Sequence, residues 1–157
     1  MTIDLTLERP LTNLDVRVVG VGGAGCSALR SLGDFLTDDT RFLGIDTGTG
    51  TDSVRNFAEL IQVGDGFGSG GDAVAAAELF VDSDGPGEYS KAVTEFVTGA
   101  DVVIIVAGLG RGSGSGIAPL VAHIAHDSGA LTLAAVNLPF EFEGRFRAQA
   151  AVQALEI

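Results

Sequence analysis

Apolar runs alternate with stretches of helical spacing along most of this chain. The apolar runs predict strands at residues 16–19, 41–45, 60–63, 102–106 and 131–136. Apolar positions three and four residues apart, with their flanking signals, predict helices at residues 27–35, about 51–59, 72–80, 88–97, from 115 or 116 to 127, and from about 144 onward. Residues 102–106 are all apolar, as expected for a central parallel strand covered on both faces. The alternation predicts an α/β fold with a three-layer, doubly wound, Rossmann-like parallel sheet.

Turn residues and length define the expected domain. Asp72 suits a helix N-cap, Gly129 suits a helix C-terminus, and residues 82–87 form a turn cluster. Residues 1–14 contain a proline and no sustained helical or strand spacing of apolar residues, so we expect an N-terminal arm there. The remaining residues, 15–157, have the length of one domain with a sizeable core.

Two glycine-rich segments, residues 20–25 and 108–116, each follow an apolar strand-like run. Glycine has no Cβ, so backbone N–H groups there can approach phosphate oxygens closely. A helix that begins just after each segment would add its N-terminal partial positive charge. The pair predicts a site that wraps a polyphosphate from both sides.

The first segment alone is ambiguous. Gly20-x-Gly22-x-x-Gly25 matches the dinucleotide fingerprint, and Asp46 follows the last glycine by 21 residues, near the position of a ribose-binding carboxylate. It also fits a glycine turn that serves only close packing of a helix on a strand. The second segment favours a triphosphate, because nine glycine-rich residues with Ser113 and Ser115 offer more donors than a dinucleotide needs. A flexible surface loop is the alternative for that segment.

Charge and composition narrow the classes of partner. The net charge of −12 argues against nucleic acid and anionic membranes, and it leaves few cations to meet phosphate. The single lysine and abundant aspartate fit a halophile or a high-GC genome equally well. There is no apolar run of bilayer length, no signal pattern, and a single cysteine, so we expect a cytoplasmic protein.

Five segments together resemble FtsZ, the prokaryotic tubulin-superfamily GTPase. They are Val19–Gly25, Ala100–Ile104, Gly108–Pro119, Gly129–Thr132 and Pro139–Arg147, which occur in family order. The resemblance covers about residues 16–157, with serines in the second glycine segment where threonines are usual. It implies GTP or GDP rather than a dinucleotide, and a strand order of 3-2-1-4-5. It also implies a role in cell-division or cytoskeletal filament assembly. We expect Mg²⁺ to help binding, because it screens the phosphates.

The same resemblance assigns the predicted nucleotide site. It places an α/β-phosphate loop near Gly22, a shortened γ-phosphate-sensing loop at Gly68–Gly71, and a β/γ-phosphate loop at Gly110–Ser115. Glu143 would accept from ribose hydroxyls, and Arg147 would neutralise charge or stack on the base. The full predicted set is Gly22, Gly23, Ala24, Ser27, Asp46, Thr47, Gly70, Gly71, Gly108, Gly110, Arg111, Gly112, Ser113, Gly114, Ser115, Glu143 and Arg147.

Three departures from the family pattern shape the functional hypotheses. Arg111 stands where glycine is usual, and either contacts phosphate or narrows the loop. The stretch after Gly64 is several residues shorter, which affects γ-phosphate sensing. The sequence stops at Ile157, without the family's central helix, the aspartate loop that activates water on a neighbour's GTP, or the C-terminal domain.

We therefore expect a GTP-binding domain with weak or partner-dependent hydrolysis, which pairs with a full-length FtsZ-like subunit or with itself. One alternative is a degenerate-site module that docks on a full-length relative without using nucleotide. A further alternative is an NAD-dependent oxidoreductase domain. We predict no catalytic residue and no metal site: His123 and His126 have no third ligand at clear spacing, and Cys26 has no accompanying base.

Overall fold

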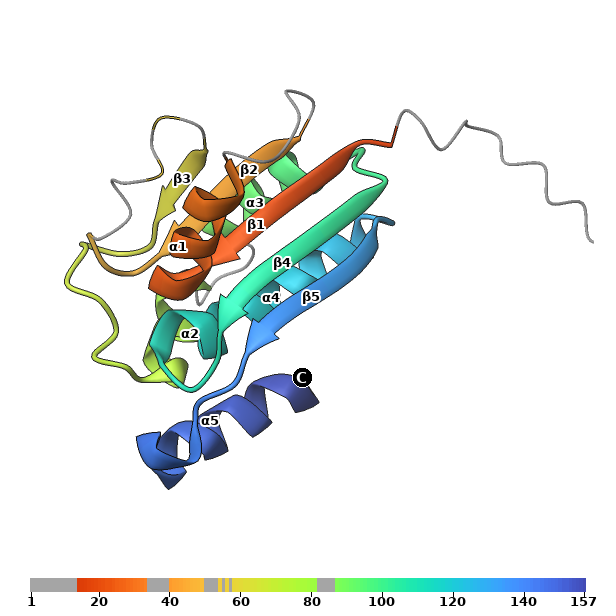
Figure 1. The fold of residues 1–157 in the computed structure, drawn as a ribbon. Helices are drawn as coiled ribbons and strands as arrows, with labels where there is room; N and C mark the ends of the chain where they lie inside the picture. Colours follow the sequence, from red (N-terminus) through yellow and green to blue (C-terminus); the bar gives the residue numbers. More distant parts are fainter. Residues whose placement is uncertain (1–13, 34–39, 50–53, 55, 57, 82–86) are drawn as a thin grey trace, which may run out of the picture.

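The computed structural model describes residues 14–33, 40–49, 54, 56, 58–81 and 87–157, which form a parallel sheet flanked by helices (Figure 1). The strands are β1 (Val16–Val21), β2 (Arg41–Asp46), β3 (Glu59–Gln62), β4 (Val102–Gly108) and β5 (Leu131–Asn137). The helices are α1 (Gly22–Gly33), α2 (Ala73–Phe80), α3 (Glu88–Val97), α4 (Gly112–Asp127) and α5 (Arg145–Glu156), with a 3-10 turn, η3 (Glu141–Glu143), before α5.

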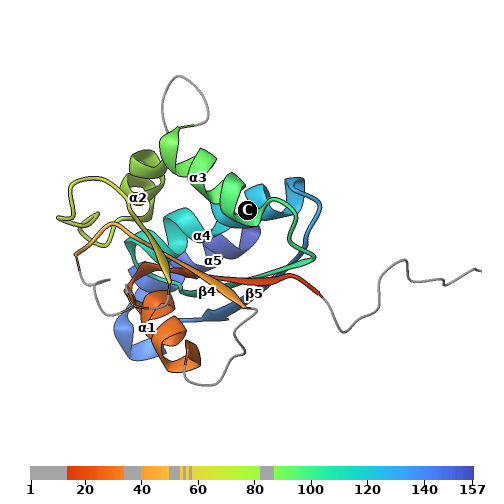
Figure 2. The ribbon, with the colours of Figure 1, turned by 90° about the horizontal axis from the view of Figure 1, so that it is seen from above.

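The five strands lie in the order β3-β2-β1-β4-β5, and each neighbouring pair is parallel. Val19 of the central strand β1 lies opposite Leu43 of β2 and Ile105 of β4. Helix α1 covers one face of the sheet, and α2, α3 and α4 lie over the other (Figures 1 and 2). The predicted three-layer parallel fold and its strand order are confirmed.

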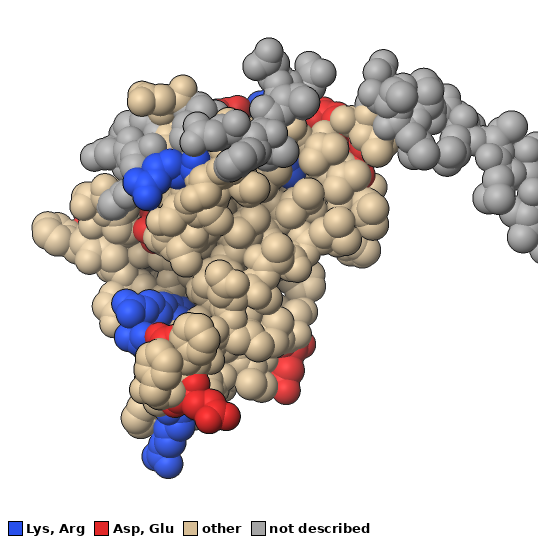
Figure 3. All heavy atoms as spheres, in the orientation of Figure 1, with Lys and Arg blue, Asp and Glu red and all other residues tan. Residues whose placement is uncertain are grey.

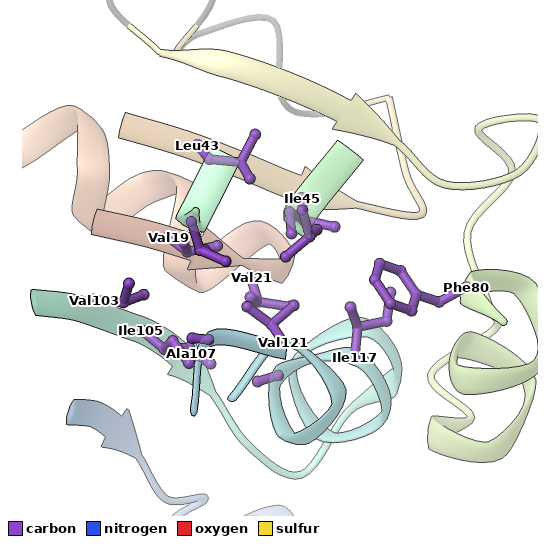
Figure 4. Packing of buried hydrophobic residues seen from close by; sticks show 14 of the residues in the cluster. Val19, Val21, Leu43, Ile45, Phe80, Val103, Ile105, Ala107, Ile117 and Val121 are labelled. Atoms are coloured by element: carbon purple, nitrogen blue, oxygen red, sulfur yellow. The ribbon is translucent and has the colours of Figure 1, made fainter. Parts of the chain in front are cut away.

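The main core fills the space between the sheet and α2, α3 and α4. Alternate residues of the central strands point into it, among them Val19, Val21, Ile105 and Ala107 (Figure 4). Phe80 of α2 and Ile117 of α4 meet these strands from the helical layer and are almost fully buried. Successive side chains of a strand point to opposite faces of the sheet, so this core contains only about half of the side chains of each strand.

A smaller core lies beneath α1, on the opposite face of the sheet. It contains Val18, Cys26, Leu29, Phe42 and Val54. Ile104 and Val106 of β4 point to this side and are only partly buried, whereas Val103, Ile105 and Ala107 on the other side are buried. Residues 102–106 are therefore covered on both faces, as expected, but less completely on the side where α1 alone lies.

Several predicted boundaries shift, and the largest shifts are at the glycine segments. Helix α1 begins at Gly22, five residues before its predicted start, and α4 begins at Gly112 rather than at 115 or 116. Strands β1, β2, β4 and β5 each run beyond the predicted end, to residues 21, 46, 108 and 137. β3 spans 59–62 rather than 60–63, so Glu59 belongs to a strand and not to the predicted helix.

Other predictions are confirmed, or fall outside the described residues. Asp72 caps α2, where its Oδ1 accepts from the N–H groups of Val74 and Ala75 at 2.8 and 3.2 Å. Gly129 follows α4 with φ +84°. Nearly all of the predicted N-terminal arm, most of the predicted helix at 51–59 and most of the turn at 82–87 lie outside the described residues.

Strand β5 lies at one edge of the sheet and is poorly covered. Leu131 and Leu133 are 60% and 49% exposed. Helix α5 packs on α4 beyond the carboxyl end of β5 and buries chiefly Ala151. The face seen in Figure 3, over α1, β4 and β5, shows few charged side chains on its visible surface.

Candidate functional site

The carboxyl ends of β1, β2 and β4 meet at one side of the sheet, where they surround a cavity of about 490 Å³. The residues that line it come from four separate stretches of the chain: Gly22, Gly23, Ala24, Asp46, Thr47, Gly48, Gly68, Ser69, Gly70, Gly71, Gly108, Arg111, Gly112, Ser113 and Gly114. Ligands of open parallel sheets bind at this position, where neighbouring strands connect in opposite directions. The fold therefore brings most of the predicted phosphate-facing residues together.

The β1–α1 turn is short because α1 starts directly after β1. Gly22 has φ +73°, a conformation that favours glycine, and a Cβ built there would lie 3.1 Å from the amide nitrogen of Gly114. The two glycine segments thus contact each other. Together with the N-terminus of α4, they present backbone N–H groups to the cavity from two sides.

The glycines of α4 also serve packing. A Cβ on Gly112 would collide with the side chain of Ser69, and one on Gly114 would collide with the carbonyl of Gly108. A Cβ on Gly116 would collide with the carbonyl of Ala73 at the start of α2. The segment is therefore not a nine-residue phosphate loop, because its second half is helix whose glycines allow close backbone contact.

A hydrogen-bond network joins the end of β2 to α4 inside the cavity. Ser113 Oγ donates to Asp46 Oδ1 at 2.7 Å, and the Thr47 N–H donates to the same oxygen at 2.8 Å. Thr47 Oγ1 lies 2.8 Å from Ser113 Oγ. Thr47 and Ser113 are buried, with 3% and 8% exposed. This network fixes the two polar side chains and the carboxylate relative to one another.

Residues 68–71 form the wall opposite the β1–α1 turn. The Gly68 N–H donates to the Thr47 carbonyl at 2.9 Å, which ties this segment to the end of β2. Gly70 and Gly71 have φ +64° and +83°, and a Cβ on either would meet nothing within 4 Å. The segment leads directly to the Asp72 cap of α2.

A second cavity of about 560 Å³ adjoins the first, and the two share Ala24, Gly108 and Arg111 as lining residues. Its outer wall comes from the segment after β5 and includes Leu138, Pro139, Phe140 and Glu143. The sequence pointed to this segment through the family-like stretch Pro139–Arg147, of which Glu143 and Arg147 were the predicted site residues. Leu138 and Pro139 carried no chemical signal of their own, although Pro139 belongs to one of the family-like segments.

Glu143 is held by two neighbours. Its Oε1 accepts from the Phe140 N–H at 3.0 Å, and its Oε2 is paired with the guanidinium of Arg147. The Phe140 N–H and then Arg147 lower the pKa of Glu143, with a smaller contribution from Arg111. The carboxylate is therefore ionised at neutral pH and faces the second cavity.

Four predicted residues do not line either of these two cavities. Ser27 is exposed on α1, and Arg147 packs beside Gly110, where a glycine Cβ would lie 3.0 Å from the Arg147 carbonyl. Gly110 is buried, and its N–H donates to Ser115 Oγ at 2.7 Å. Ser115 thus supports the turn before α4, a role that its place in the glycine pattern did not reveal.

The cavity lining offers one cationic and one anionic side chain. Arg111 is exposed at the N-cap of α4 and makes no side-chain capping bond there, and Asp46 lines the same cavity from the end of β2. Among the described residues there is no group of three or more His, Cys, Asp or Glu that could hold a metal ion. His123 and His126 instead line an apolar groove of about 370 Å³ between α4, β5 and α5.

Cys26 does not line either cavity. Cys26 is buried beneath α1, and desolvation, with the nearby Asp46 carboxylate, raises the pKa of its thiol to about 11. Within the described part of the chain, no helix is both long and apolar enough to span a membrane.

Comparison with known proteins shows which family model and which solved structures this chain resembles. Residues 15–157 match the family model described as Tubulin/FtsZ family, GTPase domain. An empty FtsZ dimer from M. jannaschii is 30% identical with a TM-score of 0.78, over 92% of this chain and 41% of that one. CetZ from Methanosaeta thermophila is 20% identical with a TM-score of 0.75, over 92% and 42%.

A protofilament structure of TubZ from bacteriophage PhiKZ is 22% identical with a TM-score of 0.72, over 92% of this chain and 44% of that one. At these identities, the CetZ and TubZ structures show a shared fold. The chain spans less than half the length of each of these three proteins.

Proposed function

The chain belongs to the Tubulin/FtsZ family as a GTPase domain, and on this basis we propose that it binds GTP or GDP in the cavity at the carboxyl ends of β1, β2 and β4. The observation that carries the proposal is the meeting of both glycine segments and residues 68–71 around one cavity. Backbone N–H groups and the α4 N-terminus would meet the phosphates there. The adjoining cavity, with Glu143, would take the ribose and base.

Arg111 supports this placement, because it lines both cavities and supplies a cation in a strongly acidic chain. A guanidinium there would contact the phosphates or lie at the rim between phosphate and ribose. Arg147 is held by Glu143 and would act on the base side through that pair. Mg²⁺ would accompany the nucleotide, since it binds phosphate oxygens with one or two carboxylates.

We further propose that hydrolysis by these 157 residues alone is weak. Phosphoryl transfer to water requires groups that hold a water opposite the γ-phosphate. The carboxylate that lines the phosphate cavity, Asp46, already accepts from Thr47 and Ser113. Acidic groups from a second, FtsZ-like subunit would then complete the site, and the role would belong to cytoplasmic filament assembly in cell division or the cytoskeleton.

The second candidate is a domain that docks on a full-length relative without using nucleotide. It is favoured by the departures at Arg111 and after Gly64. The effect of GTP on partner binding distinguishes these two candidate functions. A docking module would bind its partner equally well with and without GTP.

A cavity-filling variant tests the proposal directly. Gly23 lines the cavity on α1, and a Cβ built there lies 3.9 Å from its nearest neighbour, Asp46 Oδ2, so the fold accommodates a side chain. Gly23→Leu should lower affinity for fluorescent GTP at least tenfold while the melting temperature stays the same or rises, since leucine favours helix.

The matched control is Ser31→Leu, an exposed position on the same helix that does not line either cavity. It should bind GTP like the unmodified protein. Equal GTP affinity for Gly23→Leu and Ser31→Leu would place any nucleotide outside this cavity.

A further inference from the structure

The Asp46–Ser113–Thr47 network determines which protons are available to a ligand. Ser113 has one hydroxyl proton, and it donates that proton to Asp46 Oδ1 at 2.7 Å. Thr47 Oγ1, 2.8 Å away, must then donate to Ser113 Oγ, because a hydroxyl has a single donor. Both hydroxyl protons on this wall of the cavity are therefore already used, that of Ser113 by the Asp46 carboxylate and that of Thr47 by Ser113 Oγ.

The other oxygen of Asp46 lies near two glycines of the cavity lining. Asp46 Oδ2 is 3.9 Å from the Cβ positions built on Gly23 and on Gly48, both of which line the cavity. Among the described residues, the hydrogen bonds to the Asp46 carboxylate all reach Oδ1. A negative oxygen is thus directed to the part of the cavity where phosphate would lie.

A polyphosphate and this carboxylate compete. Two charges of the same sign a few ångströms apart at a protein surface repel strongly, and the chain already carries −12. Ser113 can donate to a phosphate oxygen only if it gives up Asp46. Arg111 is the cation in the lining, and it is exposed at the N-cap of α4.

A divalent cation resolves the competition, because Mg²⁺ is held by one or two carboxylates together with substrate phosphates. The described residues contain no ready-made group of three acidic or histidine ligands, so the protein alone does not build such a site. One carboxylate beside a phosphate-sized cavity fits a cation that arrives with the nucleotide.

We propose that Asp46 makes polyphosphate binding in this cavity conditional on a divalent cation, and that Ser113 Oγ transfers its hydrogen bond from Asp46 to a phosphate oxygen when the site fills. This inference rests on the proposed nucleotide site and adds its cation requirement. Asp46 is here a specificity-determining residue that excludes metal-free polyphosphates.

The test measures dissociation constants for GDP and for inorganic triphosphate, each in Mg²⁺ and in EDTA. The variant is Asp46→Asn, whose carbonyl oxygen can still accept from Thr47 and Ser113. The control is Asp127→Asn, which removes the same charge from an exposed position at the far end of α4. Thermal unfolding of each variant checks that the fold is kept.

We expect the unmodified protein and Asp127→Asn to lose at least tenfold in affinity when Mg²⁺ is removed. Asp46→Asn should lose less than threefold, and should bind both probes in EDTA at least tenfold more tightly than the unmodified protein. Adding Ser113→Ala to Asp46→Asn should reverse part of that gain, because residue 113 then has no hydroxyl that can donate to a phosphate oxygen.

An equal cation dependence in Asp46→Asn and the unmodified protein would overturn the inference while leaving nucleotide binding intact. A third outcome is that triphosphate binds, that its binding depends on the cation less in Asp46→Asn than in the unmodified protein, and that GDP does not bind. This outcome would support the inference and contradict the proposed function. Failure of both probes to bind any variant would contradict both.

Discussion

Arg17 is a buried cation at the amino end of β1, whereas the cavity lies at the carboxyl ends of the strands. Its guanidinium donates to both oxygens of Asp15, at 3.0 and 2.5 Å, and to the carbonyl of Phe96. Asp15 raises the pKa of Arg17, so it stays charged although only 7% of the side chain is exposed. The contact joins the start of β1 to the end of α3.

Replacing Arg17 should destabilise the fold without altering the cavity. Arg17→Met leaves the Phe96 carbonyl without this donor and weakens the anchoring of Asp15, and we expect a loss of about 2–4 kcal/mol in urea unfolding. Arg41→Met is the control: Arg41 also lies over the Phe96 ring, but its pair with Glu59 is exposed. A loss for Arg41→Met as large as that for Arg17→Met would contradict this assignment.

Cys26 predicts a pH dependence with a definite sign. Burial raises the pKa of its thiol from 9.0 to about 11. Between these values the unfolded chain loses the proton while the folded chain keeps it, so the unfolding free energy falls as pH rises from about 9 to about 11. Unfolding curves at several pH values should show this fall, and Cys26→Ala should show less of it. Rapid labelling of the native thiol at pH 8 would argue against burial.

At the scale of elements, Gly116 determines how closely α4 approaches α2. A Cβ there would collide with the Ala73 carbonyl, which belongs to backbone and cannot swing away. Gly116→Ala should cost about 1–3 kcal/mol in stability, as expected for overpacking. Gly23→Ala makes the same chemical change where the new Cβ has 3.9 Å of room. It should be neutral or slightly stabilising, and equal effects of the two in thermal unfolding would refute the packing role.

The same glycines show what sequence alone can reveal. Runs of apolar residues identified the five described strands, because parallel β-strands buried in a sheet consist largely of apolar residues. The helix starts at Gly22 and Gly112 were missed, since glycine and serine have low helix propensity and tertiary contacts override it. Close approach between Gly116 and Ala73 depends on how α2 and α4 pack, which no local pattern encodes.

The candidate site was predictable to a similar degree. Glycine segments that follow strands were expected to meet, and they do so at Gly22 and Gly114. Ser115 looked like Ser113 in sequence, yet Ser115 accepts from the Gly110 N–H whereas Ser113 donates into the cavity network. Only the path of the turn before α4 separates these two roles.

At the scale of the whole molecule, the residues that line the proposed nucleotide site lie at the carboxyl ends of the strands, and we propose that this end of the sheet docks beneath a second subunit. We predict negligible GTP turnover and no polymers from the purified 157-residue chain. Added to a full-length FtsZ-like protein, it should change that protein's assembly, most simply by capping one end. Phosphate release and light scattering measure both effects. Rapid turnover or long filaments from the chain alone would refute this proposal.

The most direct test of the central claim is calorimetric titration of nucleotide-free protein with GTP, GDP, ATP and NAD in the presence of Mg²⁺. The account predicts one site per chain, with both guanine nucleotides bound more tightly than ATP or NAD. A preference for NAD, or binding of none of the four ligands, would contradict a guanine-nucleotide site in this cavity.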